Sequence, residues 1–301
     1  MSFSKPHGPI AATPRSGRWL SIIGTMLLCG PLAACSALRL GYDSAPSLAY
    51  WWLDGYFDFS PAQATLVRKQ LQATQDWHRS QELPLLARQI ADLQAQATQA
   101  ASAEQLCDAA SALQTRFNRL VLQLAPALAE LAPTLQPAQL QHIDRAWSKR
   151  DAQWHKDTLE GLAAERVALR SQRMAERLES FYGPLRQPQL ELLRVQAQAA
   201  AADAVTVHGE RLRRHQDSLA ALAALRELPP GSAQALAAAR ALLERALVSP
   251  DSTYQQYLAR ALRQGCADLA ALHNSMQPAQ RAHLADTLQH YAQDLTELAQ
   301  P

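Results

Sequence analysis

The stretch Leu135-Gln136-Pro137-Ala138-Gln139 has the pattern of a helix start. Its apolar residue can pack on the first turn, Pro at the first helical position needs no backbone donor, and the final Gln can reach back to the cap. The pattern recurs at Phe59-Ser60-Pro61-Ala62-Gln63 and at Met276-Gln277-Pro278-Ala279-Gln280, and Leu185-Arg186-Gln187-Pro188-Gln189 keeps the spacing with Pro moved by one place. Four such starts predict a chain of successive helices.

Composition favours the same fold class. Ala, Leu, Gln, Arg and Glu favour helices and are abundant, whereas Gly numbers only 11 in 301 residues. Start and stop signals predict helices over 61–82, 84–99, 103–131, 137–181, 188–227, 232–247, 250–274 and 278–299, with Pro84 and Pro126 kinking or restarting a helix. We therefore predict an all-α multi-helix bundle with long amphipathic helices over residues 50–301.

The segment 137–181 is predicted as one long amphipathic helix. Its mainly apolar stripe recurs at spacings of three, four and seven, as in a coiled coil. The stripe consists of Leu140, Ile143, Trp147, Trp154, Thr158, Leu162 and Leu169.

Residues 1–34 have the organisation of a signal peptide. Lys5, Arg15 and Arg18 precede a short apolar run from Trp19, and small residues follow it. The apolar run is shorter than the roughly 20 residues that a membrane-spanning helix needs. We expect this segment to be a leader that is removed on export.

The end of this leader, Leu32-Ala33-Ala34-Cys35, resembles the lipobox of bacterial lipoproteins. The resemblance implies cleavage before Cys35, a diacylglyceryl thioether on its sulfur and acylation of the new amine. Several acyl chains anchor a protein stably. Ser36 favours the outer membrane by resemblance to the enterobacterial sorting rule, and residues 35–49 are expected to form a lipidated tether on its periplasmic face.

The formal charge of +2 originates in this leader. Removing the three basic residues of positions 1–34 leaves 26 basic and 27 acidic residues. Proteins that bind nucleic acid usually carry a basic excess. The expected mature chain has none, so a nucleic-acid partner is disfavoured.

Two cysteines remain in the expected mature chain, Cys107 and Cys266. In an oxidising periplasm a distant pair of this kind favours a disulfide. The alternative is two separate buried thiols. Neither residue belongs to a CxxC motif, which disfavours redox catalysis and zinc binding.

An aromatic segment, Tyr50-Trp51-Trp52-Leu53-Asp54-Gly55-Tyr56-Phe57-Asp58-Phe59, follows the tether. This segment could lie among lipid headgroups, where Trp and Tyr are favoured. It could also fill the helical core. Asp54 and Asp58 interrupt the apolar character, and core packing is the favoured interpretation. Trp51 and Trp52 are candidate interaction or ligand residues.

Motifs for catalysis are absent from the sequence. It contains no phosphate-binding Gly-rich loop, HExxH or Gly-x-Ser-x-Gly. The dipeptides Trp77-His78 and Trp154-His155 repeat; each Trp is expected in the core, with the His at its edge as a candidate ligand or interaction residue. No catalytic residue, metal site or cofactor is predicted.

Two resemblances to families follow from further motifs. Leu38-Arg39-Leu40-Gly41-Tyr42, Trp51-Trp52-Leu53-Asp54-Gly55-Tyr56, Trp77-His78-Arg79 and Phe181-Tyr182-Gly183-Pro184-Leu185 resemble an uncharacterised family of Gram-negative lipoproteins, known only as a domain of unknown function. That family implies no activity. The helix-start glutamines are also similar to the LTxxQ motif of CpxP-type periplasmic chaperones, although the Leu-Thr pair is missing and plain helix capping explains them equally.

These features predict a non-enzymatic, outer-membrane-anchored protein that acts through envelope protein partners, as a scaffold or in a chaperone-like role. The alternatives are an envelope hydrolase with a site assembled from distant helices, and a carrier of lipid or another hydrophobic ligand.

Overall fold

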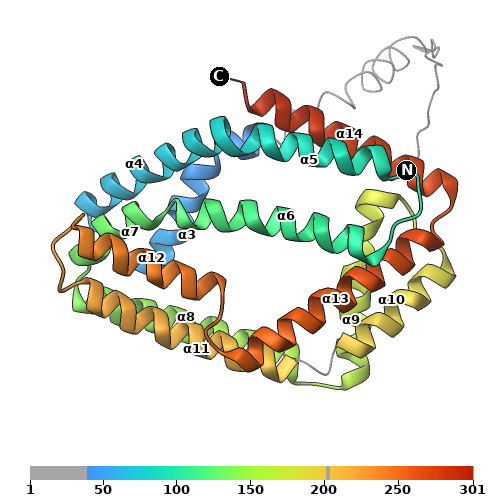
Figure 1. Cartoon of the computed structure of the whole chain (residues 1–301). Helices are drawn as coiled ribbons and strands as arrows, with labels where there is room; N and C mark the ends of the chain where they lie inside the picture. The colour runs from blue at the N-terminus through green and yellow to red at the C-terminus, as the bar shows by residue number, and fades with distance from the viewer. Residues whose placement is uncertain (1–38, 201–203, 301) are drawn as a thin grey trace, which may run out of the picture. The chain divides into compact units, whose positions relative to one another are not determined.

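The computed structural model describes residues 39–200 and 204–300, and these residues form helices without a strand (Figure 1). Residues Ser44–Pro301 make one compact unit. Its α-helices are α3 (Ala45–Phe57), α4 (Pro61–Trp77), α5 (Leu83–Gln96), α6 (Ala103–Leu122), α7 (Ala125–Leu131), α8 (Pro137–Leu159), α9 (Ala163–Tyr182), α10 (Gln187–Ala200), α11 (Ala204–Leu225), α12 (Ala233–Leu247), α13 (Ser252–Ser275) and α14 (Pro278–Leu298). The all-α prediction is confirmed.

The predicted helix starts are confirmed in atomic detail. Gln63, Gln139 and Gln280 each complete a capping box at the start of α4, α8 and α14. Gln189 makes half of this arrangement at α10: its side-chain oxygen accepts the backbone N–H of Arg186 at 2.8 Å, but the Arg186 side chain has no acceptor to complete the box. Local sequence is therefore sufficient to define where these helices begin.

The single helix predicted over 137–181 is wrong. α8 ends at Leu159 and α9 begins at Ala163, because Glu160 is extended and Gly161 has a positive φ of 81°. A residue with positive φ interrupts the helical hydrogen bonds, and Gly adopts this backbone conformation at little cost. The coiled-coil stripe consequently ends with α8: Leu162 and Leu169 are 66% and 42% exposed.

Pro84 and Pro126 act differently. Helix α6 ends before Pro126, and α7 restarts with this residue in its first turn, as predicted. Pro84 does not separate two helices, because a π-turn, η1 (His78–Glu82), joins α4 directly to α5. The N–H of Leu83 bonds to the carbonyl of His78, five residues back. This wider turn relieves the ring clash that Pro causes in an α-helix.

Two other predicted boundaries change. The helix predicted over 188–227 is divided into α10 and α11, whose main neighbours differ: α10 packs mostly against α9, and α11 mostly against α8 and α12, while both contact α13. Residues 201–203 lie outside the described part of the chain. Helix α3 begins at Ala45, so residues 45–49, which were predicted as part of a tether, are helical.

Helix contacts repeat between the two halves of the compact unit. α3 packs against α4 and α8, just as α9 packs against α10 and α14. α14 lies along α5, and α8 lies along α11 (Figure 1). α6 packs against α13, and α12 packs against α7. The last helix of each half, α8 or α14, therefore packs on a helix of the other half, and the two halves interlock.

Individual residues support this repeat. Asp54 Oδ1 accepts the N–H of Phe59, and Glu179 Oε1 accepts the N–H of Leu185, both at 3.1 Å. Between each pair the helix ends at a left-handed residue, Asp58 after α3 and Gly183 after α9. We conclude that helices α3–α8 and α9–α14 are two copies of one six-helix arrangement.

The capping glutamines join the elements within each copy. The side-chain amides of Gln63 and Gln139 exchange hydrogen bonds of 3.2 and 2.8 Å, and those of Gln189 and Gln280 exchange bonds of 2.9 and 3.1 Å. All four side chains are buried. We call each pair a glutamine clasp.

Each clasp is next to a hydrophobic core. The first core is formed by α7, α8, α11 and α12 and contains Leu135 and Ile143. The second is formed by α9, α10 and α13 and contains Met276, with Leu284 packed against it. Leu135 and Met276 occupy the same place before their clasp glutamines, which extends the repeat into the cores.

Candidate functional site

Helix α6 is amphipathic, yet none of its residues is buried. Leu106, Leu113, Phe117 and Leu120 follow spacings of seven, four and three and so share one face. Leu113 and Phe117 are exposed, Phe117 by 54%. Leu106 and Leu120 are half-buried, and α6 packs against α13 and α12. An apolar helix face normally packs against a neighbour along its length, but the middle of this face, at Leu113 and Phe117, stays exposed among the described residues.

Charged groups beside this apolar face hold α6 in place. Arg116 and Arg119 contact the carboxylate of Glu82 in η1 at 3.4 and 3.2 Å, and Glu82 is only 2% exposed. Arg116 also donates to the side-chain oxygen of Gln89 on α5 at 2.9 Å. These bonds orient α6 so that its polar side meets η1 and α5.

A disulfide joins α6 to α13. Cys107 and Cys266 are bonded, with their Cα atoms 5.4 Å apart, and the predicted pairing is confirmed. Asn274, at the end of α13, exchanges hydrogen bonds with the backbone of Ala101, just before α6. The two helices therefore run antiparallel from this anchored end.

Helix α13 exposes a second apolar row. Leu258, Leu262 and Leu269 are four and seven residues apart, lie on one helix face and are exposed. Its C-terminal end is fixed, because buried His273 contacts Tyr182 Oη at 2.9 Å and the carbonyl of Gln99 at 2.7 Å. We call the exposed rows of α6 and α13 together the apolar rows.

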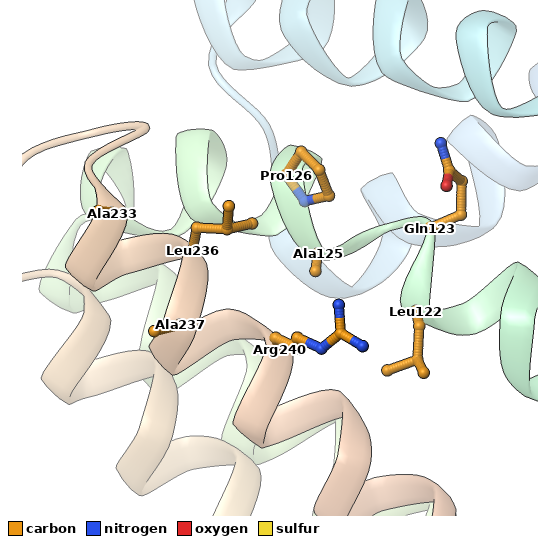
Figure 2. Close-up of a pocket in the computed structure, with 8 residues that line it drawn as sticks. All are labelled: Leu122, Gln123, Ala125, Pro126, Ala233, Leu236, Ala237 and Arg240. Carbon is orange, nitrogen blue, oxygen red and sulfur yellow. The ribbon is translucent and has the colours of Figure 1, made fainter.

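An apolar groove of about 430 Å³ lies where α6 ends, between α7 and α12. Figure 2 shows Leu236 and Ala233 of α12 opposite Ala125 and Pro126 of α7, with Arg240 reaching below Ala125. Arg240 pairs with Glu244 at 2.9 Å. Because the charge of Arg240 is paired, the groove adds apolar surface to this region without adding an unpaired charge.

A second pocket, of about 400 Å³, lies between α8 and α11 and is lined mainly by polar and ionisable residues. His215 contacts Asp151 at 3.1 Å with one ring nitrogen and Asp144 at 3.0 Å with the other. Arg211 donates to Asp151 at 2.9 Å. We call this set the histidine pocket; its lining residues are Ser148, Asp151, Ala152, His155, Glu160, His208, Leu212 and His215.

The predicted Trp154-His155 dipeptide borders the histidine pocket. Trp154 is partly buried and stacks on His208, with ring centroids 5.5 Å apart, and the guanidinium of Arg211 lies 5.2 Å from its ring. His155 lies 5.1 Å from His208 and contacts Glu160 at 3.3 Å. This dipeptide therefore belongs to a built polar site.

The Trp77-His78 dipeptide lies elsewhere, at the junction of α4 and η1. Both side chains are half-buried. Burial lowers the pKa of His78, and the nearby carboxylate of Glu82 partly opposes this shift. The two dipeptides are not brought together, so they do not form a joint site.

The core interpretation of Trp51 and Trp52 is wrong. They are 76% and 54% exposed, whereas Tyr56, one turn after Trp52 and in contact with its ring at a centroid distance of 4.8 Å, is buried. Tyr56 receives a hydrogen bond from Arg150 of α8, and α3 packs on α4 and α8. Packing into the core therefore covers only part of the apolar surface of α3.

Several predictions concern residues outside the described ranges. Leu32, Ala33, Ala34 and Cys35, with the rest of the leader, fall among them. Of the helices described between residues 39 and 300, none is long and apolar enough to cross a membrane. In the same part of the chain no three His, Cys, Asp or Glu side chains are grouped to hold a metal ion.

Sequence reasoning missed two features. It treated the clasp glutamines only as caps, because the partner of each amide is 76 or 91 residues away. It also overlooked His208, Arg211 and His215, which follow spacings of three and four on α11. That spacing places them on one helix face and was the available signal.

The fold and its surfaces define an all-helical protein with an internal repeat, exposed apolar rows and a separate polar pocket. Residues 55–255 match the model of DUF6279, a family of unknown function, and the chain belongs to this family. Neither the curated proteins nor the solved structures include a match.

Proposed function

We propose that this protein is a lipid-anchored envelope protein, on the periplasmic face of the outer membrane, that binds other proteins without catalysing a reaction. The observation that carries the proposal is the apolar face of α6, which has no buried residue and exposes Phe117 and Leu113. Large exposed apolar side chains that cluster on neighbouring elements are typical of interaction surfaces.

The surroundings of the apolar rows suit a binding platform. The disulfide between Cys107 and Cys266 fixes one end of the helix pair, and the contacts of Glu82 with Arg116 and Arg119 fix the polar side of α6. A surface that is already ordered loses less conformational entropy when a partner binds. This favours recognition of apolar segments in other polypeptides, as a scaffold or a chaperone requires.

The envelope location rests on the lipobox-like residues Leu32-Ala33-Ala34-Cys35 and on the disulfide, which suits an oxidising compartment. The similarity of the helix-start glutamines to CpxP-type chaperones points to the same compartment and to a chaperone-like role. Acylation of Cys35 would be seen as added lipid mass on the N-terminal peptide of membrane material.

An aggregation assay tests the binding role. We expect the wild-type chain to suppress aggregation of an unfolded client, and Phe117→Ser with Leu262→Ser to remove most of that effect. Leu162→Ser with Leu169→Ser, which also alters exposed apolar residues but lies on and just before α9, is the matched control and should keep it. The binding role is rejected if the wild-type chain has no effect on clients and no partner co-purifies.

A second candidate function is supported by the histidine pocket. His155, His208 and His215 lie with Asp151 and Glu160 around one hollow, which an envelope hydrolase could use for proton transfer. This role predicts that His155→Ala removes a hydrolytic activity of the purified chain. A carrier of hydrophobic ligands would instead use the apolar groove lined by Leu122 and Leu236.

A further inference from the structure

Helix α3 has apolar residues around most of its surface, and only some of them are needed to pack the fold. Tyr56 is buried, and Arg68 lies 3.5 Å above the ring of Tyr50 on the packed side. Leu48, Trp51 and Trp52 follow spacings of three and one, share the face opposite Tyr50 and are all more than half exposed. We call these three residues the α3 face. The ring of Trp52 also contacts Tyr56, with the ring centroids 4.8 Å apart.

The internal repeat supplies a comparison for the α3 face. Asp54 corresponds to Glu179, since each accepts the N–H that follows a left-handed residue after its helix. Counting back from this pair, Leu48, Trp51 and Trp52 correspond to Arg173, Glu176 and Arg177. Those three residues of α9 are also exposed.

The same positions are therefore charged in one copy and apolar in the other. Charged side chains are the usual occupants of an exposed helix face, as on α9. Because α9 packs in the same way with Arg and Glu at these places, the fold does not require tryptophan there. The apolar residues of the α3 face need another explanation.

We propose that the α3 face docks into the lipid headgroup layer of the membrane that holds the protein. This inference rests on the proposed lipid anchor. Tryptophan has an apolar body and a polar N–H and is enriched at the membrane interface. The α3 face carries no charge, so the ligand is the interface of a neutral lipid bilayer rather than an anionic headgroup.

Chain length keeps the α3 face close to the membrane. Leu48 is 13 residues after Cys35. Even a fully extended chain of that length spans at most about 45 Å. A lipidated Cys35 would thus hold the face at high local concentration beside the bilayer, where modest affinity is sufficient for docking.

Quenching by brominated phosphatidylcholine tests the docking. The lipid-anchored full chain is placed in vesicles whose acyl chains carry bromine near the headgroups, and tryptophan emission is measured. Comparison with Trp51→Phe/Trp52→Phe isolates the emission of these two residues from that of the others. We expect strong quenching of this emission in the wild-type chain.

Leu48→Arg introduces the residue of the corresponding α9 position and leaves both tryptophans in place. Removing one buried apolar side chain is expected to weaken docking about tenfold and to relieve most of the quenching. Val205→Arg on α11, which also replaces an exposed apolar residue with Arg, is the matched control and should not change the quenching. Circular dichroism of both variants checks that they fold.

A further experiment distinguishes failure of the α3 face to dock from absence of the lipid anchor on Cys35. If Cys35 carries no lipid, a chain of residues 36–301, which contains the whole compact unit, is added to the same vesicles and the Leu48→Arg effect on flotation is measured. The docking would be overturned if the wild-type chain showed neither quenching nor flotation. It would also be overturned if Leu48→Arg showed the same quenching and flotation as the wild type. Crosslinking of position 52 to a protein instead of lipid would overturn it as well.

Discussion

The side chains of Gln63 and Gln139 form a reciprocal pair, in which each amide nitrogen donates to the oxygen of the other at 3.2 and 2.8 Å. The two residues are 76 positions apart, and each also caps its own helix through the N–H of Ser60 or Gln136. Each of these glutamines thus caps the start of its own helix and, through its partner glutamine, holds a second helix in place. The pair of Gln189 and Gln280 repeats the arrangement in the second half.

We expect Gln139→Ala to lower the free energy of unfolding by about 2–3 kcal/mol, because several buried groups lose partners. The carbonyls of Phe57 and Asp58, the amide of Gln63 and the N–H of Gln136 would all be affected. Urea denaturation measures the change. Gln280→Ala should have a similar effect.

Gln105→Ala is the matched control for the clasp. Gln105 completes the capping box of α6 but is exposed and bonds only within its own helix start. Its removal should cost about 1 kcal/mol or less. An equal loss for Gln105→Ala and Gln139→Ala would show that capping alone, without pairing, explains the glutamines.

The disulfide is expected to stabilise the fold strongly. It closes a loop of 159 residues between α6 and α13, and the chain-entropy relation gives about 5 kcal/mol for a loop of this length. Cys107→Ser with Cys266→Ser should therefore lower the urea midpoint, and a reductant should lower that of the wild type but not that of the double variant. A reductant effect that persists in the double variant would contradict this assignment.

Glu210 should make stability depend on acid pH. Burial alone would raise its pKa, but hydrogen bonds from Arg213, Arg214 and Ser249 outweigh burial and lower the pKa to about 2. A lowered folded pKa means that the stabilisation is present above the ordinary value of 4.5 and is lost as the pH falls from there toward about 2. Glu210→Gln should flatten the stability profile in this range, and a profile unchanged by the substitution would argue against the network.

Asp151 is expected to hold α8 against α11. It is buried and accepts hydrogen bonds from Arg211 at 2.9 Å and from His215 at 3.1 Å. Asp151→Ala should lower stability by about 3 kcal/mol, since it leaves a charged group without its partner in a partly buried site. Asp157→Ala on the same helix is the control, because exposed Asp157 bonds only Gln153 among the described contacts. Thermal unfolding of both variants should show a large shift for the first alone.

Helix starts could be predicted from sequence because capping depends on residues within one turn. The break at Gly161 was missed because the apolar stripe continues through Leu162 and Leu169 and because Leu159, Glu160, Ala163 and Ala164 beside it favour helices. The exposure of Trp51 and Trp52 could not be predicted, since α3 is apolar on both faces and only the packing of α4 and α8 selects one.

The candidate sites were less accessible to sequence reasoning than the fold. Cys107 and Cys266 could be paired because they were the two cysteines left after the leader and Cys35. The histidine pocket joins α8 and α11 across more than 60 residues, and spacing on one helix does not identify the partner helix. The segment 103–131 was predicted only as a helix of the bundle, and its sequence does not show that Leu113 and Phe117 would be left exposed in α6.

Site-specific photocrosslinking in intact cells tests the proposed binding role most directly. A benzophenone amino acid is placed at Phe117 or Leu262 of the apolar rows, and at exposed Val205 on α11 as a control. The account predicts crosslinks to other envelope proteins from positions 117 and 262 and few from position 205. The absence of protein crosslinks at 117 and 262, or the same pattern from all three positions, would contradict it.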